Sequence, residues 1–549
     1  MKHRLFFFVT LFFSVSVFAQ VHIQIDNPET WAAEELKPYI GKTVIFDSPL
    51  VVCSNAQYPT FTVSPRRLFT PTNQAYPRTQ AYRSVVSLNS TGAIDMSGVG
   101  AYHRCGEKIY NLKAKVNSTS SLTYIDGEFR GNSRADLEAG IPDLGDYRLL
   151  VCTMNLEYYL AAGLGSGGMG PGSASQHEAQ RMKVSKALAL INADIYGFVE
   201  IESGQVALKE IATDLNAHVS GRKFTYINDG SSPNGTYTKA GFVYDANKVK
   251  PIGKLQETDI GVQNRKKMIC FEEIATHERF IFSVNHFKAK SGSGSGGDAN
   301  QNDGQGSFNE TRVKEAQEVI SMYNGYYSHR LIHDKDLLVM GDLNAYAKED
   351  PIALFTKNGM IDLHRAFHAD SSYSYQFAGL AGYLDHAICN KTLYPQVTGM
   401  AGFHINSDEN DNYTYNGKWS DNTMFRCSDH DPVLVGLKLD STLSQSLDPY
   451  VYVENFSDNV TFNNLYNLND PQNKSYFAIY NIDGVPICPP KEIKYTEEML
   501  HQKNKVYEVS LDNPYLPEEL REFMPLPSGV YILHVYTKGE VLYMKFVVK

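Results

Sequence analysis

The sequence lacks a CxxC pair, an excess of basic residues and any apolar run long enough to cross a membrane. Without paired cysteines, a zinc site built on thiolates is disfavoured. The formal net charge of −10 argues against broad, non-specific binding to polyanions, although a metal ion can supply positive charge locally. These absences argue against a thiolate zinc protein, a membrane-spanning protein and a basic protein that coats nucleic acid.

The first 19 residues have the pattern of a secretory signal peptide. Lys2, His3 and Arg4 form a charged start, and residues 5–18 form an apolar core that is too short to span a bilayer. The residues before Gln20 fit a small-residue cleavage site, and no cysteine follows the expected cut, which disfavours a lipoprotein anchor. We therefore expect a secreted or cell-surface protein.

The chain of 549 residues is long enough for three or four domains. Residues 20–146 contain short β-forming runs between polar, proline-rich loops, which predicts a small β-rich module followed by a connector. Residues 147–440 alternate apolar strands with helical patterns, which predicts an α/β layered fold. Residues 441–549 return to a β pattern. Because the connector is polar, we expect the first module to be separable from the rest.

Within the first module, residues 85–88 (VVSL) are among the runs expected to form strands. The chain has seven cysteines, and an odd number in an exported protein leaves at least one thiol free. Cys53 and Cys105 both fall in this module, so they are the pair that we expect to form a disulfide.

The stretch around Asp342 carries the clearest chemical signal. An apolar run at residues 337–340 predicts a buried strand, and after Gly341 an acid and an amide follow at alternate positions, Asp342 and Asn344. Positions two apart on extended backbone face the same way, so both side chains can project into one cleft. This arrangement suits a phosphate ester and a metal-activated water, whereas the alternative is a strand followed by an Asx turn.

Polar residues recur at the ends of predicted strands throughout residues 147–440. They are Asn155, Glu200, His286, Asp342 with Asn344, Asp385 with His386, and Asp429 with His430. Each has a structural explanation on its own, but loops at one edge of a sheet sandwich can converge. Carboxylate and amide oxygens suit a hard cation such as Mg²⁺, Mn²⁺ or Ca²⁺, and a histidine beside an acid can act as general base. A second histidine and an amide can donate hydrogen bonds to a phosphoryl oxygen, which completes a set suited to phosphoester hydrolysis.

Six motifs in a fixed order carry a family resemblance. They are residues 153–155 (TMN), 194–202 (DIYGFVEIE), 284–288 (VNHFK), 341–344 (GDLN), 383–386 (YLDH) and 428–433 (SDHDPV). This order resembles the endonuclease/exonuclease/phosphatase superfamily of the pancreatic deoxyribonuclease type. The resemblance implies a four-layer α/β sandwich with the active site at the edges of its sheets.

The resemblance also implies roles for particular residues. The implied metal ligands are Asn155, Glu200 and, nearby, Asp429. The implied catalytic residues are His430 as base, Asp385 as its orienting partner, His286 and Asn344 on the scissile phosphate, and Asp342 on the nucleophile or leaving oxygen. Glu202 and His386 should point away from the site. Arg265 and Lys288 are candidates for binding backbone phosphates, with solvated surface as the alternative.

A closer resemblance links the chain to secreted bacterial extracellular nucleases, through residues 285–288 (NHFK), 297–306 (GDANQNDGQG) and 404–409 (HINSDE). It implies a Mg²⁺-dependent phosphodiesterase that hydrolyses DNA, with RNA left open. The same superfamily includes phosphomonoesterases and phospholipases that act on nucleotides, inositol phosphates or sphingomyelin, and these are the alternative. A binding protein with a decayed hydrolase domain is disfavoured because every expected catalytic side chain is present.

The flanking regions carry resemblances of their own. Residues 40–44 (IGKTV) and the strands after them resemble the OB-fold-like domain that precedes some secreted nucleases. Residues 527–533 (PSGVYIL) and 545–549 (KFVVK) resemble the C-terminal sorting domain of the type IX secretion pathway of Bacteroidetes, which implies a bacterial protein that contacts this secretion machinery. The alternative for this end is an accessory β-sandwich.

Overall fold

The computed structural model describes residues 20–161, 169–233, 238–258, 265–327 and 334–440, and the backbone of six strands further along the chain. The expected signal peptide lies outside the described residues. Within the described part, no helix combines the length and the apolar character needed to cross a membrane.

The N-terminal module, which we define as residues 20–138, contains a seven-stranded sheet. Its strands are β1 (Val21–Ile23), β2 (Thr43–Phe46), β3 (Leu50–Ser54), β4 (Phe61–Ser64), β5 (Ile94–Ser97), β6 (Lys108–Ser118) and β7 (Ser121–Arg130). Pairing runs from β6 through β3, β4, β5 and β7 back to β6, so five strands close into a ring. Alternate residues such as Val44, Phe61 and Leu122 are buried inside. The short helices are η1 (Ala33–Tyr39), α1 (Pro71–Gln74) and α3 (Arg134–Glu138).

The strand expected at residues 85–88 is wrong, because this stretch lies in helix α2 (Gln80–Gly92). The Thr79 side chain caps the helix by accepting a hydrogen bond from the backbone N–H of Tyr82. Tyr82, Val85 and Leu88, three residues apart, are the half-buried positions on one side of the helix. The helical spacing of the half-buried side chains therefore outweighs the β preference of Val85 and Val86.

Two six-stranded sheets form the centre of the α/β region, residues 149–439. The first contains β10 (Phe224–Tyr226), β11 (Thr238–Asp245), β9 (Ile195–Glu202), β8 (Leu149–Tyr159), β21 (Val433–Leu437) and β20 (Val397–Gly402). The second contains β12 (Val249–Thr258), β13 (Lys266–Glu273), β14 (Arg279–His286), β15 (Leu337–Asp342), β19 (Asp385–Cys389) and β16 (Ile361–Asp362). A buried core that includes Val199 and Val284 joins the facing sheets. They approach so closely that a Cβ on Gly197 would lie 2.3 Å from Cγ2 of Val284.

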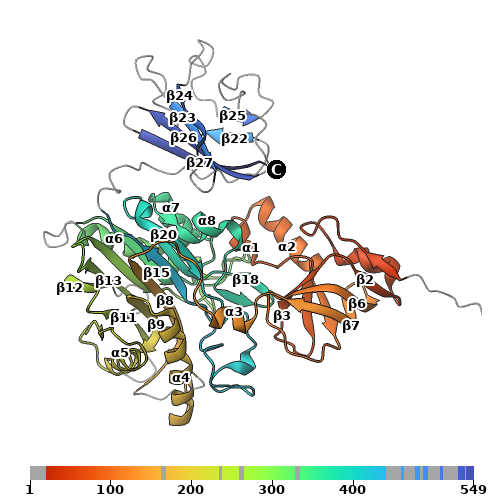
Figure 1. Ribbon diagram of the computed structural model, residues 1–549, viewed down its shortest axis with the longest axis horizontal. Helices are drawn as coiled ribbons and strands as arrows, with labels where there is room; N and C mark the ends of the chain where they lie inside the picture. The colour runs from red at the N-terminus through yellow and green to blue at the C-terminus, as the bar shows by residue number, and fades with distance from the viewer. Residues whose placement is uncertain are drawn as a thin grey trace, which may run out of the picture.

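Helices cover the outer faces of the two sheets (Figure 1). Helices α4 (Ala174–Ile191) and α5 (Val206–His218) pack on the first sheet, and α6 (Asn309–Tyr326) and α7 (Asp350–Lys357) pack on the second. Helix α8 (Leu363–His368) leads towards a small hairpin of β17 (Tyr375–Phe377) and β18 (Leu380–Gly382). The mixed α/β fold expected from the sequence is confirmed, with helix, sheet, sheet and helix in four layers.

The described C-terminal strands are all paired in antiparallel fashion. Strands β22 (Asn459–Phe462) and β25 (Tyr507–Ser510) form one pair. Strands β24 (Pro486–Glu492), β23 (Tyr476–Asn481), β26 (Gly529–Thr537) and β27 (Glu540–Val548) form a four-stranded sheet. The β pattern of this part of the sequence is therefore confirmed as strands.

The disulfide expected between Cys53 and Cys105 is not formed. Both thiols are free and buried in the structure. Burial raises the pKa of Cys53 to about 11 and that of Cys105 to about 12, so both are neutral thiols near pH 7. They behave as small apolar side chains in the module.

Candidate active site

The topology brings the predicted strand-end residues to one edge of both sheets. Strands β8 and β9 run parallel, as do β14 and β15, so residues at their carboxyl ends share an edge. Strand β19 runs antiparallel to β15 and starts at this edge, where Asp385 is the register partner of Asp342. Strand β21 likewise runs antiparallel to β8, so Asp429 and His430, just before it, reach the same edge. The hypothesis that these residues converge is correct.

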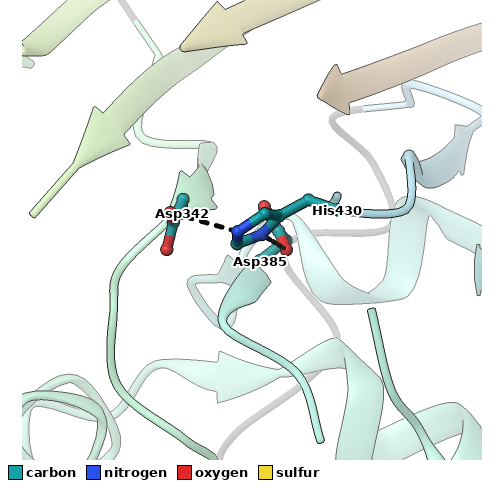
Figure 2. A group of neighbouring side chains, drawn as sticks. All are labelled: Asp342, Asp385 and His430. Carbon is teal, nitrogen blue, oxygen red and sulfur yellow. Dashed lines mark hydrogen bonds and ion pairs between the residues drawn. The ribbon is translucent and has the colours of Figure 1, made fainter. Parts of the chain in front are cut away.

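His430 and Asp385 form a hydrogen-bonded pair in the site (Figure 2). Nδ1 of His430 lies 2.7 Å from Oδ2 of Asp385, and both side chains are buried. Nε2 faces Oδ2 of Asp342 and Oδ2 of Asp429, each at 3.9 Å. Burial acts to lower the pKa of His430, but the carboxylates of Asp385, Asp429 and Asp342 outweigh it and hold the pKa well above its ordinary value.

His286 lies between two of the acids. Its Nε2 is 3.5 Å from Oε1 of Glu200 and 3.6 Å from Oδ2 of Asp342. Burial, with the positive charges of Arg265 and His430, holds the pKa of His286 well below its ordinary value. The ring is therefore neutral near pH 7. A neutral imidazole can donate a hydrogen bond from one nitrogen without adding charge.

Asp342 is held by the two amides that the sequence indicates. Nδ2 of Asn155 donates to its Oδ2 at 3.2 Å, and the backbone N–H of Asn344 donates to its Oδ1 at 2.8 Å. This second bond is the Asx turn, so the turn and the convergence of Asp342 and Asn344 are both present. Gly341 is required before them, because a Cβ there would lie 2.2 Å from the carbonyl oxygen of Asn285.

Glu200 and Asp342 have raised pKa values. Burial and the charge of Asp429 raise the pKa of Glu200 to about 7, although His430 and Arg265 oppose the shift. Burial also raises the pKa of Asp342 to about 7 despite the nearby His430. These carboxyl groups therefore repel one another and lack enough compensating charge from the protein.

This donor set fits a divalent cation. Oxygen atoms from carboxylates and an amide are the ligands that Mg²⁺ and Ca²⁺ prefer, and a cation would offset the repulsion between the acids. In the described part of the chain, the acids and histidines whose ligand atoms all lie within 4.8 Å of one another are Asp342, Asp385 and His430. This group does not include Glu200 or Asp429, which were the expected ligands. Asn155, the third, already uses Oδ1 to accept from the N–H of Glu157 at 2.9 Å, but an amide oxygen has a second lone pair.

Arg265 and Lys288 differ in how near they come to this chemistry. Arg265 is half-buried, donates to Oγ1 of Thr238 at 3.2 Å, and its charge acts on Glu200 and His286. The ammonium of Lys288 lies 4.5 Å from the centre of the Phe308 ring. Arg265 therefore lies beside the acids, whereas Lys288 is held by an aromatic ring.

Alternation along strand β19 turns His386 away from its neighbour Asp385. Glu202 is two residues from Glu200, and the left-handed backbone at Glu200 (φ 56°) interrupts the alternation between them. Glu202 and His386 are both fully buried, and Nε2 of His386 lies 2.7 Å from the carbonyl oxygen of Ala345. Each is placed in the packed interior.

Three site residues were missed from the sequence. Ser374 donates to Oδ2 of Asp385 at 2.7 Å, and the Tyr375 ring stacks on His430 with centroids 4.5 Å apart. Burial and the charge of Asp429 raise the pKa of Glu157 to about 8, which places this acid beside the others. Glu157 is two residues from Asn155, so the alternation argument used for Asp342 and Asn344 was an available signal. Ser374 and Tyr375 follow no apolar strand, and the sequence holds no comparable signal for them.

The search against family models found no match, and no curated protein matches either. Among solved structures, the chain is similar to an endonuclease/exonuclease/phosphatase from Bacteroides vulgatus, with 15% identity, a TM-score of 0.35, and 53% of this chain and 99% of that chain covered. It is similar to a mannosyl-6-phosphatase from Bacteroides thetaiotaomicron, with 16% identity, a TM-score of 0.35, and coverage of 53% and 100%. It is also similar to D. rerio TDP2 in complex with a single-strand DNA product, with 13% identity, a TM-score of 0.35, and coverage of 53% and 99%.

Proposed function

We propose that this chain is a secreted, metal-dependent phosphodiesterase of the endonuclease/exonuclease/phosphatase superfamily that hydrolyses nucleic acid. The observation that carries the proposal is the buried His430–Asp385 pair, which faces Asp342 among acids whose pKa values are raised. A base with its orienting carboxylate, next to acids that need a cation, is the equipment for adding water to a phosphate ester.

The metal site of this proposal consists of Glu200, Asp429 and Asn155, with Asp342 beside them. Mg²⁺ is the cation that we propose, with Mn²⁺ and Ca²⁺ as the other hard cations that such ligands accept. When bound, a divalent cation stabilises charge on the phosphate oxygens and lowers the pKa of a bound water.

The protein groups have separate tasks in this scheme. Asp385 accepts a hydrogen bond from Nδ1–H of His430. The carboxylates of Asp385, Asp429 and Asp342 raise the pKa of His430, and a cation held by the acids would offset their charge, so that a neutral Nε2 could take a proton from water. His286 is neutral and faces Glu200 and Asp342, so its N–H can donate to an oxygen of the scissile phosphate. Asn344 contacts the scissile phosphate together with His286. Asp342 positions the nucleophile or protonates the leaving oxygen. Arg265 and Lys288 bind neighbouring phosphates.

The remaining parts of the chain complete the proposal. Residues 1–19 would be the signal peptide of a bacterial protein that is secreted or held at the cell surface. Residues 20–146 would be an OB-like module with a connector, which the closed ring of five strands and the parallel pairing of β5 with β7 support. Residues 147–440 would be the catalytic domain. Residues 441–549 would be a β-sandwich that the secretion machinery recognises.

The substrate is decided by a direct assay. The purified full chain should cleave plasmid DNA with Mg²⁺ and should lose this activity in excess EDTA. It should leave p-nitrophenyl phosphate and sphingomyelin largely uncleaved, because those are substrates of the alternative phosphomonoesterase and phospholipase functions. His430→Ala should lower the activity by about 10²-fold or more, whereas His277→Ala, just before the start of strand β14, should keep it. Faster turnover of either small substrate would replace nuclease with the alternative function.

A further inference from the structure

Ser374, just before strand β17, and Tyr375, the first residue of β17, contact the His430–Asp385 pair. Ser374 donates to Oδ2 of Asp385 at 2.7 Å and accepts from the Asp385 backbone N–H at 3.2 Å. The backbone carbonyl of Ser374 accepts from the N–H of Asp431 at 2.8 Å. The Tyr375 ring lies on the imidazole with an interplanar angle of 29°. The orientation of the base therefore depends on where this hairpin lies.

The N-terminal module pairs with the other strand of this hairpin. The backbone N–H of Ala381 donates to the carbonyl of Leu68 at 2.9 Å, and the N–H of Thr70 donates to the carbonyl of Ala381 at 2.8 Å. Phe69 and Ala381 thereby form a parallel β-bridge. A backbone segment of the module thus extends the hairpin and limits how far it can move.

Asn73 joins the two chain segments that carry the positioning groups. Its Nδ2 donates to the carbonyl of Ser372 at 3.3 Å, and its Oδ1 accepts from the N–H of Tyr383 at 3.2 Å. Asn73 is fully buried, and its two partners lie two residues before Ser374 and two residues before Asp385. One side chain of the module therefore fixes the spacing between the segments that hold Ser374 and Asp385.

Arg67 makes a second connection from the module. Its guanidinium lies 4.0 Å from the centre of the Tyr373 ring, Nη1 donates to the Tyr373 hydroxyl at 3.2 Å, and Nη2 forms an ion pair with Asp408. The other face of Tyr373 stacks on His404, with centroids 3.7 Å apart. Nδ1 of His404 lies 2.9 Å from Oδ2 of Asp431, which follows His430 in the chain.

We propose that Arg67 and Asn73 are positioning residues for the His430–Asp385 pair, so that the N-terminal module completes the active site instead of acting as a separate appendage. The proposal rests on the proposed function for its kinetic test, but the contacts themselves do not depend on the substrate. Arg67 and Asn73 act through the segment 372–385 and do not touch the reacting atoms.

The kinetic test compares variants of the full chain on plasmid DNA with Mg²⁺. Arg67→Ala and Asn73→Ala should each lower kcat by about 10-fold or more with KM nearly unchanged, because small misplacements of a catalytic group are costly. Arg67→Lys, which keeps the charge, should restore part of kcat. Arg66→Ala is the matched control, because Arg66 donates to the carbonyls of Pro28 and Leu88 within the module. Equal kcat values for Arg66→Ala, Arg67→Ala and Asn73→Ala would overturn the proposal.

A second comparison asks whether Asn73 acts through Ser374. The loss in Asn73→Ala combined with Ser374→Ala should be little larger than in Ser374→Ala alone, because residues that act as a unit are not additive. Strictly additive losses would show that Asn73 does not work through this serine. If Arg67→Ala fails to fold, Asn73→Ala decides the matter, because it leaves the ion pair with Asp408 intact.

Amide hydrogen exchange separates failure of this proposal from failure of the proposed function. Residues 372–385 should exchange faster in Arg67→Ala and Asn73→Ala than in the wild type, and at the wild-type rate in Arg66→Ala. A wild type that cleaves no phosphodiester would refute the function, while the exchange data would still test the contacts. Unchanged exchange in both variants would overturn the positioning role even in an active enzyme.

Discussion

Two groups of buried acids in this protein behave in opposite ways. Asp408 and Glu409, at the boundary with the N-terminal module, are fully buried on their side chains and paired with arginines. Burial acts to raise the pKa of Asp408, but Arg67 and Arg104 outweigh it and lower the pKa to about 2. Among the acids at the sheet edge, Glu200 and Asp342 instead have pKa values raised to about 7.

The pKa values of the two groups differ because different groups supply the compensating positive charge. Glu409 accepts from Nε of Arg104 and from Nη2 of Arg134, both at 2.6 Å, and from the Tyr102 hydroxyl at 2.9 Å. Every one of these partners comes from the N-terminal module. In the described part of the chain, no guanidinium fork pairs with Glu200 or Asp342, so a bound cation would relieve their repulsion. Paired acids thus join two parts of the fold, whereas under-compensated acids mark the site of chemistry.

This comparison revises the expectation that the N-terminal module is separable. A chain that begins near Gly145 would lack Arg67, Arg104 and Arg134 and would leave two buried carboxylates without their partners. Removing one partner of a buried ion pair is strongly destabilising because the remaining charge has no compensation. The polar connector in the sequence does not reveal this, because the contacts lie on other residues.

The largest expected effect concerns the boundary acids. Glu409→Gln should lower the free energy of unfolding by about 3 kcal/mol, because the buried Arg104 and the half-buried Arg134 lose their shared carboxylate. Glu128→Gln is the matched control, because Glu128 pairs with Arg130 at an exposed site where solvent screens the ion pair and its contribution to stability is small. Urea denaturation of both variants measures the difference. Equal midpoints would mean that the boundary acids do not stabilise the fold.

The next effect concerns turnover at the sheet edge. His430→Ala should lower kcat on plasmid DNA by about 10²-fold or more, as expected for loss of a general base. Asp385→Asn should cost less, and the double variant should be little worse than His430→Ala, because the two residues act as a unit. Thermal denaturation should show little loss of stability in His430→Ala. A double variant with strictly additive losses would assign the proton transfer to another group.

A smaller effect concerns cation binding to the folded protein. Mg²⁺ at about 100 times its dissociation constant should stabilise the wild type by roughly 2.7 kcal/mol, because the ion binds only the folded chain. Glu200→Gln should reduce this gain, since it removes one acid of the site, whereas Glu128→Gln should keep it. Differential scanning calorimetry with and without EDTA measures both. A full gain in Glu200→Gln would exclude Glu200 as a ligand.

The smallest effect is the dependence of stability on pH without metal. Glu200 and Asp342 have folded pKa values of about 7, above their unfolded values, so their contribution is full in acid and is lost as pH rises through 7. Asp408 has a folded pKa of about 2, below its unfolded value, so its contribution is present at neutral pH and is lost as pH falls towards 2. In EDTA, stability should therefore be highest at mildly acidic pH and should fall when the pH is raised or lowered from there. Added Mg²⁺ should remove the loss of stability near pH 7. An unchanged loss with Mg²⁺ would show that it does not arise at the proposed metal site.

Sequence reasoning was sufficient to place most of the candidate site residues at the sheet edge. His286 and Asp342 end strands β14 and β15, Asn155 and Glu200 lie near the carboxyl ends of β8 and β9, and parallel neighbours bring their carboxyl ends to one edge. The signal is local, because the apolar run and the polar residue that ends it are neighbours in the chain. The same period-two argument, applied to Asn155, would also have found Glu157.

Only the tertiary structure decided how the N-terminal module meets the site. Arg67 reaches Asp408 across 341 positions, and Asn73 reaches Tyr383 across 310. No periodicity or spacing links residues so far apart, since such contacts depend on how the two parts of the fold pack against each other. The sequence by itself therefore determined which residues end the strands and carry reactive groups. Docking decided which buried acids are paired with arginines, because a carboxylate's partner is set by what packs against it in space.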